Sequence, residues 1–167
     1  MERRSQIPSF RGLLDLVLGV GNTLMRDEGV GVHAIQYLQQ HHADLPDTEY
    51  VDGGTLSFTL AGIIEQAQNL IVIDATQLHA QAGAIRTFIG GEMDAFLNHN
   101  RKSSVHEVSL MDLLSIAALA EQLPPQRALV GIQPQIIDWG ESPSAPVQAA
   151  LPQACAQVVS LIRAWQE

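Results

Sequence analysis

The feature that most constrains the fold is a series of short apolar runs separated by amphipathic stretches. Leu13–Val20 contains the run Leu-Val-Leu-Gly-Val, and Leu70–Ile73 is continuously apolar. Strands that are apolar on both faces are typical of the buried centre of a parallel sheet. Ala84–Ile89 alternates instead, which indicates an edge strand, and Ala128–Ile132 predicts the last strand. Tyr50–Val51 is expected at the end of a short second strand.

Between these runs, apolar residues recur at helical spacing. The predicted helices are Gly29–His41, Leu56–Gln68, Ser104–Leu123 and Pro146–Trp165. Strands that alternate with helices predict an α/β fold, a twisted and mostly parallel sheet of about five strands with helices on both faces. Residues 13–167 are expected to form one domain, and residues 1–12 a poorly ordered N-terminal extension.

Charge and cysteine content narrow the functional classes. The 167 residues include 9 Lys and Arg against 18 Asp and Glu, a net charge of −9, which disfavours a nucleic-acid partner. Cys155 is the single cysteine, so no intrachain disulfide can form, and its apolar surroundings predict a core position. The apolar stretch Leu13–Met25 is interrupted by Asp15, Gly19, Gly21 and Asn22, so neither a signal peptide nor a membrane span is expected. We expect a cytoplasmic protein.

Three familiar catalytic or binding motifs are incomplete or absent in this chain. Gly19 and Gly21 follow a strand, but Leu24 replaces the third glycine of a dinucleotide-binding fingerprint. His106-Glu107 lacks the second histidine of a zinc protease, because position 110 is leucine. No Gly-x-Ser-x-Gly nucleophile elbow is present. Nucleotide binding therefore has little support, and serine hydrolysis has none.

Three residues from separate segments are candidate metal ligands. Glu28 follows the first strand and Asp74 ends the third, so both belong near the carboxyl edge of a parallel sheet, where such folds bind ligands. Ser104 and Glu107 fit a capping box, which would place His106 in the first helical turn. The helix dipole there favours neutral imidazole, the form that binds metals. Two carboxylates and an imidazole suit nickel, zinc or iron.

Each of these residues also has a simpler explanation. Asp74 could cap a helix or anchor a loop, Glu28 could favour a helix N-terminus, and His106 could be a satisfied capping residue. The residues alone leave these alternatives open.

Several motifs together resemble one family. The segment from Gly19 to Val32, with Gly21, Asn22, Leu24, Asp27, Glu28, Gly29 and Gly31, is similar to the N-terminal signature of nickel–iron hydrogenase maturation endopeptidases. Later segments match the family's other motifs in order and spacing: Asp52-Gly53-Gly54-Thr55, Ile73-Asp74-Ala75, Ser104-x-His106-Glu107 and Leu129-Val130-Gly131-Ile132-x-Pro134. The resemblance covers about residues 13–165.

The resemblance implies a specific endopeptidase, of a family usually grouped with aspartic-type enzymes. Such an enzyme removes the C-terminal extension of a nickel–iron hydrogenase large-subunit precursor after nickel has been inserted. Glu28, Asp74 and His106 would contact nickel that the substrate supplies, and zinc or cadmium could take its place in a crystal. The expected partner is that precursor, and the protein is expected to act as a monomer without nucleic acid or membrane.

The resemblance leaves the proton-transfer group open. Asp52 and Asp74 are the candidate catalytic residues. Asp52, in a glycine-flanked loop, could position substrate or act in acid–base chemistry, but it could equally form a turn. A nickel-binding accessory protein without proteolytic activity is the alternative function.

Overall fold

The computed structural model describes residues 15–100 and 108–167. The expectation of an N-terminal extension at residues 1–12 lies outside them. Five strands form one sheet in the order β2-β1-β3-β5-β4, in which β4 alone runs antiparallel to its neighbour. The strands are β1 (Asp15–Val20), β2 (Thr48–Gly54), β3 (Asn69–Ala75), β4 (Ile85–Ile89) and β5 (Gln126–Ile132).

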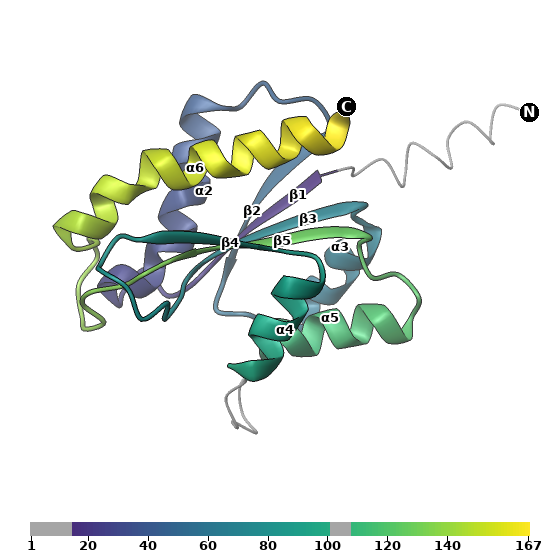
Figure 1. Ribbon diagram of the computed structural model, residues 1–167, viewed down its shortest axis with the longest axis horizontal. Helices are drawn as coiled ribbons and strands as arrows, with labels where there is room; N and C mark the ends of the chain where they lie inside the picture. Colours follow the sequence, from purple (N-terminus) through teal and green to yellow (C-terminus); the bar gives the residue numbers. More distant parts are fainter. Residues whose placement is uncertain (1–14, 101–107) are drawn as a thin grey trace, which may run out of the picture.

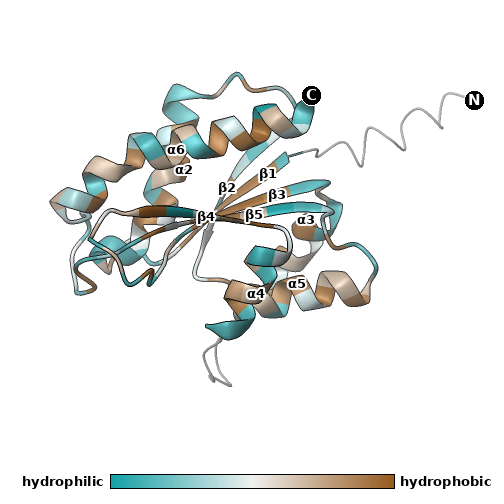
Figure 2. Cartoon of the chain, viewed as in Figure 1, coloured by the Kyte–Doolittle hydropathy of each residue, from teal (hydrophilic) through white to brown (hydrophobic). Residues whose placement is uncertain are grey.

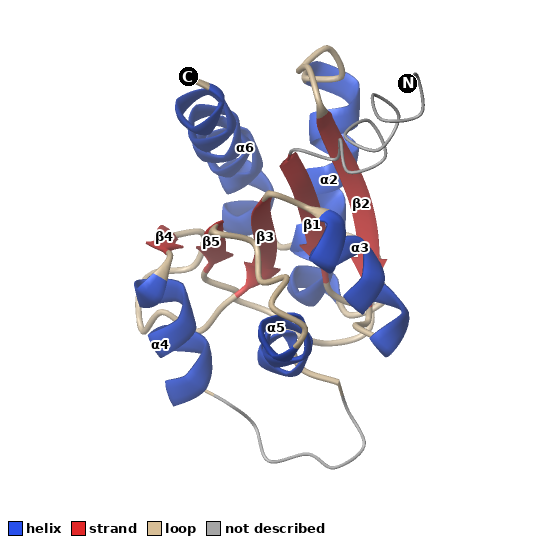
Figure 3. Cartoon of the chain, turned by 90° about the vertical axis from the view of Figure 1, so that its right-hand side faces the viewer, coloured by secondary structure: helices blue, strands red, loops and turns tan. Residues whose placement is uncertain are grey.

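Helices cover both faces of this sheet (Figures 1 and 3). α2 and α6 pack on one face, and α3, α4 and α5 on the other. The helices are η1 (Arg26–Gly29), α2 (Val30–His41), η2 (Phe58–Leu60), α3 (Ala61–Gln66), α4 (Gly91–His99), α5 (Leu110–Leu119) and α6 (Ala145–Gln166). The predicted fold class is therefore confirmed, including the edge position of β4.

The central strands are buried on both faces, which explains their unbroken apolar runs. Val17 and Ile71 belong to the core beneath α2 and α6. Their neighbours Leu16 and Leu70 belong to the core beneath α3, α4 and α5. Successive side chains of a strand point to opposite faces, so each strand contributes to two cores. The apolar colouring of the sheet in Figure 2 follows from this arrangement.

α6 is long and apolar enough to cross a membrane by length and composition alone. Eight of its residues, however, are buried in the core between the helix and the rest of the domain. One of them is Cys155, whose thiol pKa is raised to about 12 by burial. The prediction that Cys155 is a core residue is confirmed, and the thiol is protonated at neutral pH.

The structure corrects several predicted elements. β2 continues to Gly54 instead of ending near Tyr50–Val51, and the expected helix Leu56–Gln68 is reduced to η2 and α3. The sequence pattern missed α4 entirely. The long helix expected over Ser104–Leu123 is wrong in its extent, because α5 begins at Leu110 after the N-cap Ser109.

The sheet has a topological switch point beside β1. β1 lies between β2 and β3, so the chain continues to opposite sides of it. The register aligns Gly19 of β1 with Asp52 of β2 and with Ile73 of β3. The carboxyl ends of all three strands therefore lie together, at the place where sheets of this kind bind ligands.

Candidate active site

Close backbone contacts fix the loop that follows β1. A Cβ atom on Gly31 would overlap the carbonyl oxygens of Val20 and Ile73, so the start of α2 lies directly against the ends of β1 and β3. Gly21 has φ of +138°, and a Cβ there would overlap the carbonyl oxygen of Glu28. Only glycine permits both approaches. The glycines of this motif thus hold Glu28 at the switch point.

Asp27 anchors this loop to a distant one. Its side chain is fully buried and accepts hydrogen bonds from the backbone N–H of Gln135 and Ile136, both at 2.8 Å. The backbone N–H and the hydroxyl of Ser144 donate two more, at 2.6 and 2.7 Å. Burial alone would raise the pKa of Asp27, but these hydrogen bonds together outweigh it and lower the pKa. Asp27 is therefore a structural carboxylate.

Glu28 and Asp74 line the same pocket. Both side chains are half-buried. Glu28 comes from η1 and Asp74 from the end of β3, and the pocket between them has a volume of about 420 Å³. The other lining residues are Ala75, Thr76, Gln77, Phe96, Leu97, Asn100, Leu129, Pro134 and Ile137. The prediction that these two acids converge at the carboxyl edge of the sheet agrees with this geometry.

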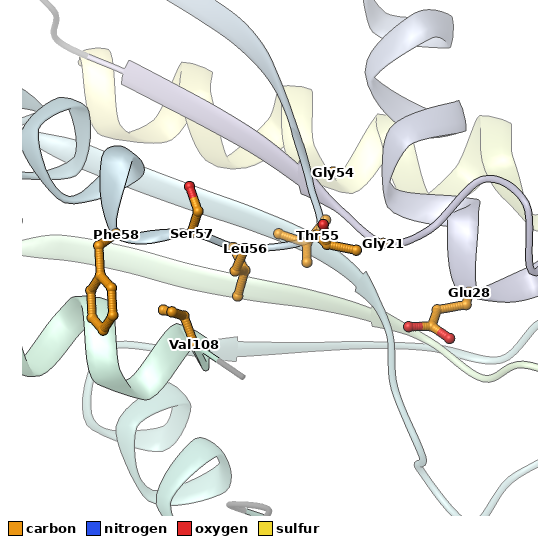
Figure 4. Close-up of a pocket in the computed structure, with 9 residues that line it drawn as sticks. Gly21, Glu28, Gly54, Thr55, Leu56, Ser57, Phe58 and Val108 are labelled. Atoms are coloured by element: carbon orange, nitrogen blue, oxygen red, sulfur yellow. The ribbon is translucent and has the colours of Figure 1, made fainter. Parts of the chain in front are cut away.

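Glu28 also lines a second pocket, of about 470 Å³, on the β2 side (Figure 4). In the close-up the Glu28 carboxylate lies at one end, and Phe58 and Val108 lie at the other. Gly21, Gly54, Thr55, Leu56 and Ser57 line the space between them, together with Val20. Glu28 thus stands where two pockets meet, each large enough to take several atoms of a peptide chain.

His106, with Ser104 and Glu107, lies outside the described residues. The two pockets nevertheless include the residues on either side of that segment, Asn100 in one and Val108 in the other. The predicted capping box is not the start of α5. Its N-cap is Ser109, whose hydroxyl accepts from Asp112 N while the Asp112 carboxylate accepts from Ser109 N. α5 begins four residues after His106, and the predicted lowering of the His106 imidazole pKa falls on residues outside the described ones.

Asp52 occupies a third, neighbouring pocket of about 290 Å³. This pocket shares Gly21, Gly54 and Thr55 with the second one, but includes neither Glu28 nor Asp74. One oxygen of Asp52 accepts a hydrogen bond of 2.8 Å from Gly54 N, which is a turn-forming contact. A catalytic role for Asp52 stays a prediction.

The described residues bring two carboxylates together but do not form a complete metal cage. Within residues 15–100 and 108–167, no group of three His, Cys, Asp or Glu side chains could hold a metal ion. Two half-buried carboxylates can supply oxygen ligands or exchange protons with a substrate. Further ligands must come from elsewhere if a metal is held here.

Comparison with known proteins identifies the family to which this chain is similar. A family model described as hydrogenase maturation protease matches residues 32–161. The hydrogenase expression/formation protein HupD of Rhodobacter capsulatus is 33% identical over 160 residues, which cover 95% of this chain and 76% of HupD. The hydrogenase 2 maturation protease of Escherichia coli is 34% identical over 149 residues, covering 89% of this chain and 90% of that one.

Solved structures agree as well. The E. coli hydrogenase maturating endopeptidase HybD superimposes with a TM-score of 0.81 at 30% identity, over 90% of this chain and 92% of HybD. The nickel–iron hydrogenase maturation protease HybD of Thermococcus kodakarensis gives a TM-score of 0.71 at 26% identity, over 89% and 99%. The family model, the curated relatives and the solved structures together show that this chain belongs to the hydrogenase maturation protease family and is an endopeptidase.

Proposed function

We propose that this protein cleaves the C-terminal extension from the precursor of a nickel–iron hydrogenase large subunit, in the cytoplasm and as a monomer. In this proposal Glu28, Asp74 and His106 contact nickel that is already held in the precursor. The observation that carries the proposal is the position of Glu28, which shares one pocket with Asp74 and joins it to a second. A peptide that crosses both pockets must pass this carboxylate.

His106 is included because Ser104-x-His106-Glu107 matches a motif of the family. His106 precedes Val108 by two residues, and a chain spans at most about 7 Å over that separation. Val108 lines the pocket that contains Glu28. A histidine side chain that reached the Glu28 end of this pocket would add a nitrogen ligand to the two carboxylate oxygens, a set that suits nickel.

The chemistry of such a site depends on the substrate. Nickel that arrives with the precursor can polarise the scissile carbonyl or lower the pKa of an attacking water. Carboxylates at the carboxyl ends of the strands would hold the metal and the attached peptide in position for cleavage. Asp74 and Asp52 are the candidates for proton transfer or substrate positioning. Cleavage would then depend on correct metal loading.

The test is processing of a nickel-loaded precursor by three single variants, Glu28→Gln, Asp74→Asn and His106→Ala. Each should lower the cleavage rate by about 100-fold or more, the scale expected when a group that stabilises developing charge is lost. Glu49→Gln is the matched control, because Glu49 is an exposed acid in β2, paired with Leu16 and away from these pockets. It should cleave at the wild-type rate.

Folding of every variant is checked by circular dichroism. Near-normal cleavage by a folded Glu28 or His106 variant would remove that residue from the proposed site. Wild-type protein that binds the precursor tightly but never shortens it would favour a nickel-binding accessory role instead.

A further inference from the structure

Exposed hydrophobic side chains gather in two loops beside the site. Among the described residues, Leu24, Ile137 and Trp139 are 52%, 51% and 75% exposed. Leu24 lies in the loop after β1, and the other two lie in the loop after β5. The backbones of the two loops are joined by hydrogen bonds from Gly140 N to Leu24 O, 2.9 Å, and from Asp27 N to Ile136 O, 3.1 Å. Single exposed hydrophobics are common, but three on one pair of joined loops need an explanation.

These loops are held rigidly. The buried Asp27 carboxylate accepts four hydrogen bonds from the second loop. Arg26 N donates to Gly140 O at 2.8 Å, and Arg26 Nε donates to Ser142 O at 3.0 Å. A surface whose backbone is already fixed loses little conformational entropy when a partner binds. The exposed side chains are therefore presented on a preorganised platform.

The platform is continuous with the candidate active site. Ile137 lines the pocket that contains Glu28 and Asp74. Leu24 lies in the loop after β1, just ahead of η1, and η1 contains Glu28. Any protein whose peptide reaches those carboxylates must place its own surface near these loops.

We infer that Leu24, Ile137 and Trp139 form the docking surface for the folded body of the protein substrate, an inference that rests on the proposed function. The partner is a protein with a complementary apolar surface, since Trp is enriched at the centres of protein interfaces and those buried centres are more apolar than the rest of the surface. Asp138 and Glu141 flank Trp139 and Gly140 in sequence, and the chain carries a net charge of −9. Both acids are exposed and outnumber the basic side chain that contacts this loop, Arg26. The negative charge disfavours anionic membranes and favours a partner with basic groups around its apolar centre.

The test compares Trp139→Ser with Leu119→Ser in binding and cleavage of the nickel-loaded precursor. Leu119 is the matched control, because it is 86% exposed and far from the site. It is the last residue of α5, and the chain continues from there to the amino end of β5, whereas the site lies at the carboxyl ends of the strands. Trp139→Ser should raise both Kd and KM by about tenfold or more, the effect of losing an aromatic hot spot. Its kcat should stay at the wild-type value, because Trp139 does not line the pockets of the site. Leu119→Ser should change neither constant.

The outcomes separate this inference from the function itself. If wild-type protein does not cleave the precursor, the proposed function fails. If wild-type protein cleaves it while Trp139→Ser keeps a Kd and KM within twofold of wild type, the docking surface is wrong and the function stands. Equal weakening by Leu119→Ser would also overturn the inference, as would sedimentation showing a stable self-association lost in Trp139→Ser while precursor binding is unchanged.

Discussion

Two buried aspartates, Asp15 and Asp27, have opposite effects on the pH dependence of stability. Asp27 accepts four hydrogen bonds, and its pKa lies below the ordinary value of 3.8 although burial opposes this shift. Asp15, 1% exposed, has its pKa raised by burial, although Asn69 and Gln166 donate to it at 2.8 and 2.7 Å. The number of donors around each carboxylate decides which effect prevails.

Asp27→Asn should lower the free energy of unfolding at pH 7 by about 1–3 kcal/mol or more, because an amide leaves buried donors unsatisfied. A carboxylate whose pKa is lower in the folded state than in the unfolded state stabilises the fold at pH values above its unfolded-state pKa. This stabilisation is lost as the pH falls through the folded-state pKa. The penalty of the variant should therefore shrink below about pH 4. Urea titrations between pH 3 and 7 measure it, and a constant difference would contradict the role of the carboxylate charge.

Asp15→Asn should show the reverse trend. A raised folded-state pKa means that the stabilising contribution is complete below the unfolded-state pKa and is lost as pH rises through the folded-state value. Wild-type stability should thus fall relative to Asp15→Asn as pH rises from about 4 towards neutrality. The same urea titrations check the sign. A relative stability that moves the other way would show that Asn69 and Gln166 outweigh burial.

The position in the fold could be predicted from the sequence for some single residues and not for others. Glu28 and Asp74 were predictable, because each follows an apolar strand and parallel strands end at one edge. Asp27 was not, because its donors Gln135, Ile136 and Ser144 lie 108 to 117 residues away and belong to a loop without a periodic pattern. A fully buried acid directly before Glu28 gives no local signal of its partners.

At the scale of elements, glycine contacts set the position of α2. Gly31→Ala should destabilise the fold by about 1–3 kcal/mol, the usual effect of overpacking, because the new methyl group would meet backbone atoms of β1 and β3 that cannot move aside. Gly62→Ala in α3 is the matched control, since nothing lies within 4 Å of a Cβ at that position. It should stabilise the protein by up to about 1 kcal/mol, the helix-propensity difference between Gly and Ala.

Thermal or urea unfolding distinguishes the two glycine variants. Equal stability of the Gly31 and Gly62 variants would mean that α2 does not depend on this close contact. Cleavage by the Gly31 variant should fall as well, because Glu28 precedes α2 directly and moves with it.

The helices show where sequence patterns fail. Ser104 to Glu107 and Ser109 to Asp112 both fit a capping box, and the second marks the start of α5 because the buried positions Leu110, Leu113 and Leu114 begin there. α4 was missed because it starts at Gly91 and buries only Met93, which leaves little periodic signal. Strands were easier, because central strands have unbroken apolar runs.

At the scale of the whole molecule, the proposed function assigns to the substrate the groups that complete the site. The described residues contribute two carboxylates in one pocket and an apolar platform beside it, without a self-sufficient metal cage among them. If the precursor brings the metal, as proposed, and also the surface that docks on this platform, the protease would act on that one partner. Selectivity for this substrate would then follow, because the enzyme supplies the carboxylates and the platform while the substrate supplies the metal and the docking surface.

The most direct test of this account is cleavage of the same precursor with and without bound nickel by purified wild-type protein, read by mass spectrometry of the precursor's C-terminus. The account predicts a single mass loss from the nickel-loaded precursor and none from the nickel-free form, with casein left intact as a general protease substrate. Equal cleavage of the nickel-free precursor, or broad degradation of casein, would contradict the claim that the substrate completes the active site.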